Sequence, residues 1–395
     1  MSQTILEKLL NGAEVEWKTL GEVCNLKRGR VISKQYLAER SGRYPVYSSQ
    51  TANQGKIGTL DTYDFDGEFI NWTTDGANAG TVFYRNGKFS LTNVSGLINV
   101  INNSILNCKY LFYWLTIEAK CHVYTGMGNP KLMSHQVKAI PIPIPPLSVQ
   151  KEIVGILDAF TAHTAELTAE LTAELNERKK QYNYCRDKLL TFSDNEAEWK
   201  KLGDITQPTQ NIKWKHNNQH YLYIDLTSVD RENNVVAKTV KISSKNAPSR
   251  AQKIVEKNDV IFATTRPTLQ RYTIIDEKYS GQIASSGYCV LRAKYKNVLP
   301  KWIYYNIASN KFLTYVEVTQ SGSAYPSISD VKVKEFIIPI PSIKTQERIV
   351  SILDKFDALT TSISEGLPRE IELRNKQYEY YRDQLLNFPK PDMEN

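Results

Sequence analysis

The sequence is poor in the residues that most metal and nucleophile sites require. Its 395 residues include only 5 histidines and 5 cysteines. The cysteines are odd in number and form no C-x-x-C pair, which favours reduced thiols in a reducing compartment over a disulfide framework. No histidine lies in a grouping with cysteine or carboxylate that resembles a zinc site. His216 and His220 are four residues apart, but their polar surroundings are typical of a loop. We therefore expect no metal site and no catalytic residues.

Long apolar runs and nucleotide motifs are also missing. No segment is apolar enough to span a bilayer and the start of the chain lacks a signal-peptide core, so we expect a cytoplasmic protein without membrane contact. No G-x-x-x-x-G-K-[ST] loop is present, which argues against an ATP motor. The only Pro-Pro pair, Pro145–Pro146, lies between Ile144 and Leu147 and does not match the Asn/Asp-Pro-Pro-aromatic motif of an adenine methyltransferase.

The sequence does contain an internal repeat. "IPIPPLSVQKEIVGILDAF", from Ile142, matches "IPIPSIKTQERIVSILDKF", from Ile338. The match continues without a gap, and about half of the positions from Ile142 to Phe192 are identical to their partners. Self-similarity of this kind predicts two copies of one structural unit.

A second match lies at the start of each copy. "EVEWKTLGEV", from Glu14, resembles "EAEWKKLGDI", from Glu196. The segments that follow, roughly 20–125 and 202–321, look unlike each other. We call the repeated segments the frame and the unlike segments the inserts. After an inert duplication, uniform drift would have changed the frame and the inserts to the same degree. A sharp frame around dissimilar inserts therefore predicts one scaffold that presents two different surfaces.

The repeated part predicts a long helix. The proline-rich segment is extended, and from Val149 apolar residues recur every three or four positions over about 43 residues, or roughly 64 Å. In the first copy this seam consists of Ile153, Leu157, Phe160, Thr164, Leu167, Leu171, Leu175, Arg178, Tyr182, Cys185 and Leu189. In the second copy it consists of Ile349, Leu353, Phe356, Ile363, Leu367, Ile371, Tyr378, Tyr381 and Leu385. We expect the two helices to pack antiparallel, with a kink or break at Glu365–Pro368.

Two repeated features could suggest chemistry. Glu16-Trp17-Lys18 and Glu198-Trp199-Lys200 fit the E-x-K half of a nuclease site, but the first Asp in the chain is Asp61, so packing of the two tryptophans explains the repeat better. The basic helix ends fit a solvated face or a protein contact better than phosphate contact. Their residues are Arg178, Lys180 and Arg186 in the first copy and Arg374, Lys376 and Arg382 in the second.

The inserts have the pattern of mixed α/β domains. Short alternating runs such as "YPVYSSQ", "GEFINWTT", "HYLYIDLTSV" and "GYCVLRAKY" predict strands. "KYLFYWLTIEAK", from Lys109, and "PKWIYYNIASNKF", from Pro300, each predict one helix. The expected fold class is α/β (α+β), with two domains built on curved sheets and separated by two long antiparallel coiled-coil helices in a pseudo-twofold arrangement.

Polar loops in both inserts are rich in the side chains that bind nucleic acid. The net charge of +8 agrees with a polyanionic partner without proving one. Arg and Lys pair with phosphate or guanine, and Asn and Gln pair with adenine. In the first insert the candidate DNA-binding residues are Lys27, Arg28, Arg30, Ser49, Gln50, Asn53, Lys56, Thr73, Thr74, Asn78, Asn129 and Lys131. In the second insert they are Ser249, Arg250, Lys253, Thr265, Arg266, Arg271, Ser285, Ser286, Ser323 and Tyr325.

In layout the chain resembles the specificity subunits of type I restriction-modification enzymes over its whole length. The residues that carry the resemblance are "PIPPLSVQKEIVGILD", "PIPSIKTQERIVSILD", the tyrosine-rich basic helix ends and the Trp-x-x-Leu-Gly entries at Trp17 and Trp199. "TAELTAELTAEL", Thr164 to Leu175, resembles the subgroup with tandem copies of that unit in its central spacer. The loops Gly126–Pro130 and Gly322–Pro326 match positions that face DNA in the family.

The resemblance implies a division into recognition domains and helices. The expected parts are a first target recognition domain, a central helix with the TAEL repeats, a second target recognition domain and a C-terminal helix, at 1–145, 146–195, 196–341 and 342–395. Each recognition domain would read one half of a split, asymmetric sequence in double-stranded DNA.

The resemblance also implies partners. The helices would dock two methyltransferase subunits, and restriction subunits with ATP-driven translocation would join through those. S-adenosylmethionine, ATP and Mg²⁺ would belong to the partners, with no cofactor bound by this chain. The chain would direct adenine-N6 methylation and restriction without being an enzyme itself. The alternatives are a coiled-coil structural adaptor with two protein-binding heads, or a stand-alone nuclease, for which an acidic metal cluster is missing.

Overall fold

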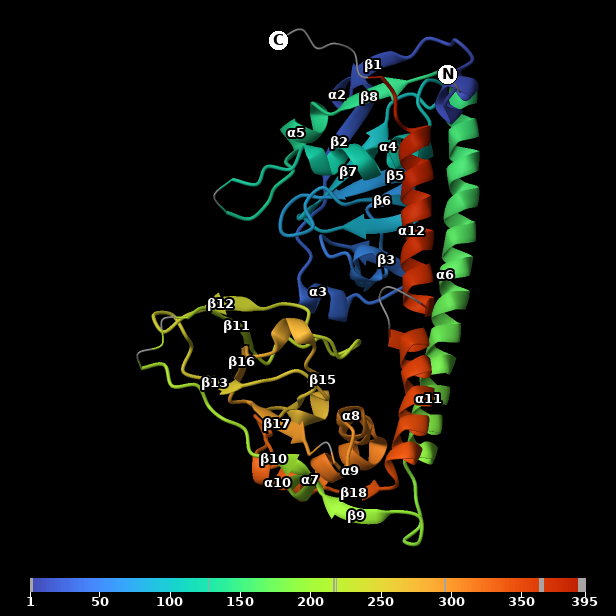
Figure 1. Ribbon diagram of the computed structural model, residues 1–395. Helices are drawn as coiled ribbons and strands as arrows, with labels where there is room; N and C mark the ends of the chain where they lie inside the picture. The colour runs from blue at the N-terminus through green and yellow to red at the C-terminus, as the bar shows by residue number, and fades with distance from the viewer. Residues whose placement is uncertain are drawn as a thin grey trace. The chain divides into compact units, whose positions relative to one another are not determined.

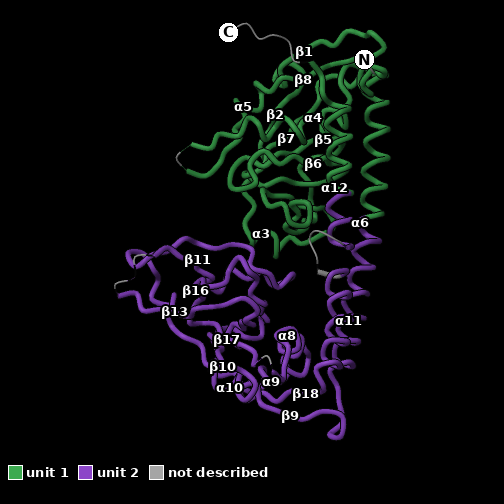
Figure 2. Tube along the Cα trace, viewed as in Figure 1, with its two compact units in different colours: residues 1–167, 374–395 green, residues 168–373 purple. Residues whose placement is uncertain are grey.

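A computed structural model describes residues 3–126, 128–215, 217, 219–294, 296–361 and 366–389. The chain forms two compact units, coloured green and purple in Figure 2: unit 1 contains residues 1–167 and 374–395, and unit 2 contains residues 168–373. Each unit joins sheets to a part of the long helices (Figure 1). This is the mixed α/β architecture with two sheet-rich parts and long helices that the sequence predicts.

Unit 1 is built on a six-stranded sheet in which only the β3–β6 pair is parallel. Its strands, in spatial order, are β2 (Cys24–Arg28), β7 (Ser95–Val100), β5 (Phe65–Thr73), β6 (Val82–Leu91), β3 (Tyr44–Tyr47) and β4 (Lys56–Leu60). The helix α4 (Cys108–Cys121) packs on this sheet through a core that includes Trp72 and Leu111. The side chain of Asn107 begins the helix by accepting a hydrogen bond from the Tyr110 amide at 3.0 Å.

Short elements complete unit 1. The strands β1 (Glu16–Thr19) and β8 (Pro141–Ile144) form a separate antiparallel pair. The remaining short elements are α1 (Ile5–Leu10), α2 (Leu20–Val23), α3 (Lys34–Glu39), η1 (Ala52–Gly55) and α5 (Ser134–Lys138).

Unit 2 contains two four-stranded sheets and a two-stranded pair. The first sheet has the order β10 (Thr206–Gln207), β17 (Tyr288–Ala293), β14 (Val260–Ala263) and β15 (Tyr272–Ile274). The second has the order β12 (Val240–Ile242), β11 (Tyr221–Ile224), β16 (Ile283–Ser285) and β13 (Ala251–Ile254). The pair consists of β9 (Glu198–Lys201) and β18 (Ile337–Ile340).

The helices of unit 2 correct one prediction. The single helix expected from Pro300 is two helices, because Ser309 has extended backbone angles and its side chain accepts a hydrogen bond from the Phe312 amide at 3.2 Å. Serine here ends one helix and begins the next. The short helices of this unit are α7 (Leu202–Ile205), η2 (Pro267–Leu269), η3 (Glu277–Tyr279), α8 (Pro300–Ala308), α9 (Asn310–Thr319) and α10 (Asp330–Glu335).

The long helices follow the repeat. The helix α6 (Leu147–Leu189) has 43 residues, as the seam predicts. In the second copy α11 (Ile343–Thr361) ends before the expected break and α12 (Gly366–Leu385) begins within it, with Pro368 in the first turn, where its missing N–H is tolerated. Ile363 of the seam and Glu365 of the expected break lie outside the described residues.

Antiparallel packing of the long helices is confirmed within unit 1. The ring of Phe160 on α6 stacks on Tyr381 of α12, with centroids 5.4 Å apart and planes 3° from parallel. The Thr161 hydroxyl donates to the Tyr378 hydroxyl at 3.1 Å. Moving forward along α6 thus means moving backward along α12.

The expectation for the basic helix ends is wrong at one position. Arg178 is exposed, as a solvated face requires, and does not belong to the buried seam. Arg186 is only 4% exposed, and its guanidinium contacts Asp187, Asn183 and the Tyr182 ring. The i,i+3 and i,i+4 pattern could not reveal this, because the burying surface comes from another part of unit 2.

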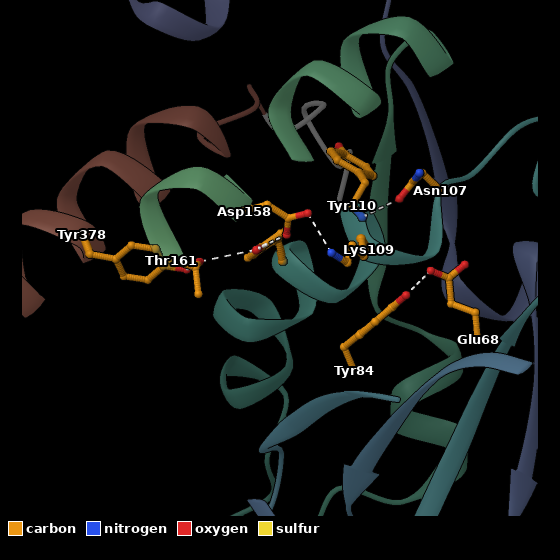
Figure 3. A network of polar contacts seen from close by, with 9 residues as sticks. Glu68, Tyr84, Asn107, Lys109, Tyr110, Asp158, Thr161 and Tyr378 are labelled. Carbon is orange, nitrogen blue, oxygen red and sulfur yellow. Dashed lines mark hydrogen bonds and ion pairs between the residues drawn. The ribbon is translucent and has the colours of Figure 1, made fainter. Parts of the chain in front are cut away.

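The two copies hold their helices with the same contacts. In unit 1 Asp158 of α6 binds the Lys109 ammonium and the Tyr113 hydroxyl, both at 2.7 Å, in the polar network of Figure 3. In unit 2 Asp354 contacts Lys301 and Tyr305 in the same way. In each unit, the sheet-bearing part is therefore joined to its long helix by an ion pair and by a hydrogen bond from a tyrosine hydroxyl.

A buried glutamine repeats as well. The Gln150 side chain is fully buried, accepts from the Asn107 amide and donates to the carbonyls of Ile105 and Pro145, each at 2.8 Å. Gln346 makes the corresponding three bonds in unit 2 with Leu299, Asn297 and Pro341. These bonds tie the start of the long helix to the segment that precedes the domain helix.

The two tryptophans of the E-x-K repeats pack, as predicted. Trp17 pairs with Pro143 across β1 and β8 and meets Trp114 edge-on at 5.8 Å. Trp199 pairs with Pro339, and the Lys311 ammonium lies 4.4 Å from its ring centroid. The flanking lysines form ion pairs with the glutamates of their own motifs.

The two dissimilar inserts contain a common four-stranded sheet. The spatial order is β2-β7-β5-β6 in unit 1 and β10-β17-β14-β15 in unit 2. In both units this order takes the first, fourth, second and third of these strands along the chain, and every neighbouring pair is antiparallel. The two inserts therefore share a sheet topology, although their sequences look unlike each other. Apolar residues of similar volume can replace one another in a packed strand at modest cost, so two sequences can share this topology with few identical residues.

Candidate nucleic-acid interface

Five loops of unit 1 are joined to one another by hydrogen bonds. They are 27–30, 48–56, 73–80, 92–95 and 124–132, and we call them loop cluster 1. Residue 127 lies outside the described residues. Three backbone bonds and one side-chain bond join them: Gly29 donates to Ser95 at 3.1 Å, Thr74 to Val94 at 3.3 Å and Gly76 to Pro130 at 3.0 Å, and the Thr92 hydroxyl donates to the Ser48 hydroxyl at 3.0 Å. Sequence segments up to a hundred residues apart thus form one surface.

A corresponding set of loops meets in unit 2. Segments 249–253, 264–271, 285–287 and 321–328 form loop cluster 2. The Ser286 amide donates to the Arg250 carbonyl at 2.7 Å, and the Arg266 amide donates to the Pro326 carbonyl at 2.7 Å. All of the residues predicted from the second insert fall in this cluster.

One threonine anchors each cluster. The amide and the hydroxyl of Thr74 both donate to the Val94 carbonyl, at 3.3 and 3.0 Å, while its own carbonyl accepts from Leu132. Thr264 repeats this in unit 2 with Gly287 and Ile328. We call these two residues the threonine anchors. They fix the loop after the central strand to the loop before α5 or α10.

Most of the predicted residues of loop cluster 1 are accessible. Ser49 is half-buried, and the side chains available at the surface are Lys27, Arg28, Arg30, Gln50, Asn53, Lys56, Asn78, Asn129 and Lys131. Arg30 is partly occupied, since its guanidinium forms an ion pair with Asp64 at 3.0 Å and lies 5.2 Å from the Tyr36 ring. The cluster therefore offers cations and amides together, the combination that contacts phosphates and base edges.

Loop cluster 2 offers a different set of side chains. Ser249, Arg250, Arg266, Ser323 and Tyr325 are exposed, and Thr265 and Ser286 are half-buried. The Arg266 guanidinium lies 5.1 Å from the Tyr325 ring, so the two side chains form one cation–aromatic pair at the surface. Hydroxyl groups and arginines dominate in loop cluster 2, whereas amide side chains are prominent in loop cluster 1.

Three predicted residues have no accessible hydroxyl in this structure. Thr73, Thr74 and Ser285 are each at most 1% exposed. Thr73 donates to the Asn78 carbonyl, Thr74 serves as an anchor, and the Ser285 hydroxyl accepts from the Gly287 amide at 3.2 Å. The expectation of direct contact is corrected for these three: their hydroxyls hold the loops in place.

Two predicted cations of unit 2 are also occupied within the protein. Lys253 forms an ion pair with Asp330. Arg271 is half-buried and donates to the Leu226 carbonyl at 2.5 Å. Both belong to loop cluster 2, and their contacts hold it against neighbouring parts of unit 2.

Sequence reasoning missed a buried cation under loop cluster 1. Arg85 on β6 is 5% exposed, and burial lowers the pKa of its guanidinium to about 10. Its nearest sequence signal is the run "FYRNG", in which an arginine directly follows two aromatic residues in a strand. An arginine in a strand is usually solvent-facing, so the sequence alone does not predict that this one is buried.

Among the described residues, no group of three or more His, Cys, Asp or Glu side chains is placed to hold a metal ion; His216 lies outside the described residues. Burial raises the pKa of the Cys24, Cys108 and Cys289 thiols to about 12, which keeps them protonated at neutral pH. In the same part of the chain, no helix has the length and apolar character of a membrane span.

Comparison with known proteins gives a consistent result. The protein-family model described as type I restriction modification DNA specificity domain matches residues 13–177 and 195–373. The chain is 35% identical to a type I restriction enzyme specificity subunit of Escherichia coli over 98% of both chains. It is also 35% identical to a candidate type I restriction enzyme specificity subunit of Haemophilus influenzae, over 98% of this chain and 99% of that one.

A solved structure has the same fold. A chain from a study of complex assembly and conformational transition of the type I R-M system aligns with a TM-score of 0.64, covering 94% of this chain and 97% of that chain. The sequence identity is 14%, so this likeness concerns the fold.

Proposed function

Because the chain belongs to the family of type I restriction-modification DNA specificity subunits, we propose that it binds a two-part DNA sequence and that each loop cluster reads one part. One observation carries this proposal. The same four-stranded core, with the same threonine anchor, presents two different sets of exposed side chains. Two readers on one frame would recognise two different half-sites, so the complete target would not be a palindrome.

The contact residues that we propose are the accessible members of the two clusters. Exposed lysines and arginines would bind phosphates, and Gln50, Asn53, Asn78 and Asn129 are suited to the donor and acceptor edge of adenine. In unit 2 the Arg266–Tyr325 pair is suited to a guanine edge or to a stacked contact. Thr73, Thr74 and Ser285 support these loops from below.

We further propose that the chemistry resides on partner subunits. Two methyltransferase subunits would dock on the long helices and would bring S-adenosylmethionine, while restriction subunits would bring ATP and Mg²⁺. In this account the chain itself is not an enzyme and works in the cytoplasm, where its DNA is. The exposed tyrosines Tyr184 and Tyr380 occupy the same position of the repeated helix ends and are suited to protein contact.

The three TAEL units would set the distance between the half-sites, as in the subgroup that the sequence resembles. They lie inside α6, which carries the chain from unit 1 into unit 2. One unit adds about 6 Å and turns the helix by about 40° beyond a full turn. Either change would alter the spacing at which both readers can bind.

Selection of bound sites from a random duplex library tests this function. The assembled complex is expected to enrich one motif of two dissimilar parts, with an affinity that falls steeply with salt because phosphate contacts release counterions. An assembled complex that enriches no motif and shows no salt dependence would favour the structural adaptor instead.

A further inference from the structure

Arg85 is a buried cation directly beneath a recognition loop. It lies on β6, next to β3 in the sheet, and β3 leads into the loop Ser48–Lys56 of loop cluster 1. Only 5% of the residue is exposed. The loop above it carries Gln50, Asn53 and Lys56, three of the proposed contact residues.

The guanidinium binds the loop and the sheet at the same time. Its Nη2 donates to the Gln54 carbonyl at 2.5 Å, and its Nε donates to the Asn71 Oδ1 at 2.7 Å. It also lies over the Tyr47 ring, 3.6 Å from the centroid, and 4.7 Å from that of Phe83. The planar fork of an arginine can make these contacts together, whereas a lysine ammonium cannot.

The loop requires such a support. Asn53 and Gln54 have φ angles of 50° and 52°, a left-handed conformation that side chains other than glycine rarely adopt, and Gly55 continues it at 83°. The Ser48 amide donates to the Gly55 carbonyl at 2.8 Å and the Gln50 side chain donates to the Lys56 carbonyl at 2.8 Å. The Arg85–Gln54 bond fixes the carbonyl at the centre of this strained turn.

The charge of Arg85 has no counterion within the described part of the chain. Its hydrogen-bond partners are a neutral amide and a backbone carbonyl, and no described carboxylate lies within ion-pair distance. Arg292 in unit 2 shows the usual arrangement, because it forms ion pairs with both Asp259 and Glu256. A buried cation without a carboxylate destabilises the fold, and an apolar side chain of similar volume would serve packing better. The presence of an arginine here therefore indicates a role other than stability.

We propose that Arg85 is a positioning residue for DNA recognition: it fixes the Ser48–Lys56 loop in its reading conformation and directs an uncompensated positive charge toward the phosphates of the bound half-site. This inference rests on the proposed function, since it assigns one half-site to unit 1. It requires that loss of Arg85 impairs one half-site and spares the other. A residue needed only for folding would affect both.

The experiment compares Arg85→Met and Arg85→Lys with the wild-type chain in the assembled complex, by site selection from a random duplex library. Arg266→Ala identifies the half-site of unit 2, and Arg292→Met is the control for loss of a structural arginine. Arg85→Met is expected to lower discrimination at the other half-site at least tenfold and to leave that of unit 2 unchanged. Arg85→Lys, which retains the charge and the stem, is expected to give a smaller loss at the same half-site.

Amide hydrogen exchange of the complex without DNA measures the loop directly. In both Arg85 variants, exchange in residues 48–56 is expected to rise, while exchange in β7 stays at the wild-type level. Wild-type discrimination at both half-sites with Arg85→Met, equal loss at both, or unchanged exchange in the loop would each overturn the proposal; if Arg85→Met does not fold, Arg85→Lys decides by the same criteria. A wild-type complex that selects no motif would overturn the proposed function and this inference with it.

Discussion

The two units share a frame and differ in what they build beside it. In unit 1 the strands β3 and β4 extend the common four-stranded core into a six-stranded sheet, with β3 parallel to β6. In unit 2 the additional strands form a separate sheet, which supplies β13 and β16 to loop cluster 2. The constant part comprises the core, the threonine anchors and the glutamine bonds, and the variable part comprises the loops. Such a division lets a recognition surface change without loss of the fold that positions it.

The strongest way to break the comparison is to change the helix between the units. Deleting Thr168–Leu171 removes one TAEL unit and shifts the second reader by about 6 Å along the helix. Affinity for the original site is expected to fall about 100-fold or more, because simultaneous binding of both half-sites is lost. Site selection should recover the same two half-sites at a new spacing. An unchanged preferred spacing would contradict this role of the repeats.

The glutamine bonds test whether the frame is equivalent in the two units. Gln150→Leu and Gln346→Leu each leave a buried amide and buried carbonyls without a partner, so each variant is expected to lower the free energy of unfolding by about 3 kcal/mol. Urea unfolding of the full chain in its complex measures the effect, with the exposed Gln181→Leu as control. If one variant lowers the free energy of unfolding more than twice as much as the other, the two frames are not equivalent.

The threonine anchors test the link between frame and reading. Thr74→Val and Thr264→Val keep the side-chain volume and remove one hydroxyl bond, at an expected cost of about 1 kcal/mol each. Each variant should weaken discrimination only at the half-site of its own unit. Thr62→Val, at an exposed position between β4 and β5, provides the control. Loss at the half-site of the other unit would contradict local anchoring.

A single phosphate contact gives the smallest effect. Lys27→Ala removes one exposed cation of loop cluster 1, so the slope of log affinity against log salt is expected to decrease by about 0.9, with little change in sequence preference. Lys8→Ala on α1 lies outside both clusters and should leave the slope unchanged. A change in the selected bases without a change in slope would assign Lys27 to base contact instead.

Part of this molecule could be predicted from its sequence because some constraints are local. The seam from Ile153 to Leu189 follows from helix periodicity, and its repetition indicates the partner helix. The packing of Trp17 and Trp199 follows from their repetition at corresponding positions. The polar loops are visible as composition.

Other features depend on contacts that no local pattern records. The sequence predicts Thr74 as an exposed loop residue, because its hydrogen bond to the Val94 carbonyl forms only in the folded chain. Arg186 and Arg85 lie in runs that look solvent-facing, and tertiary packing buries both. The common core is not visible in the sequence, because strand order is set by long-range pairing and the strands themselves share few residues.

The most direct test of the central claim is methylation mapping by single-molecule sequencing. DNA from cells that express this chain with its cognate methyltransferase subunit would be compared with DNA from cells that lack only this chain. The account predicts a chain-dependent motif of two dissimilar parts, with one modified adenine in each part on opposite strands. Absence of chain-dependent methylation, with the complex shown to assemble, would contradict it and would make the long helices the functional surface of an adaptor.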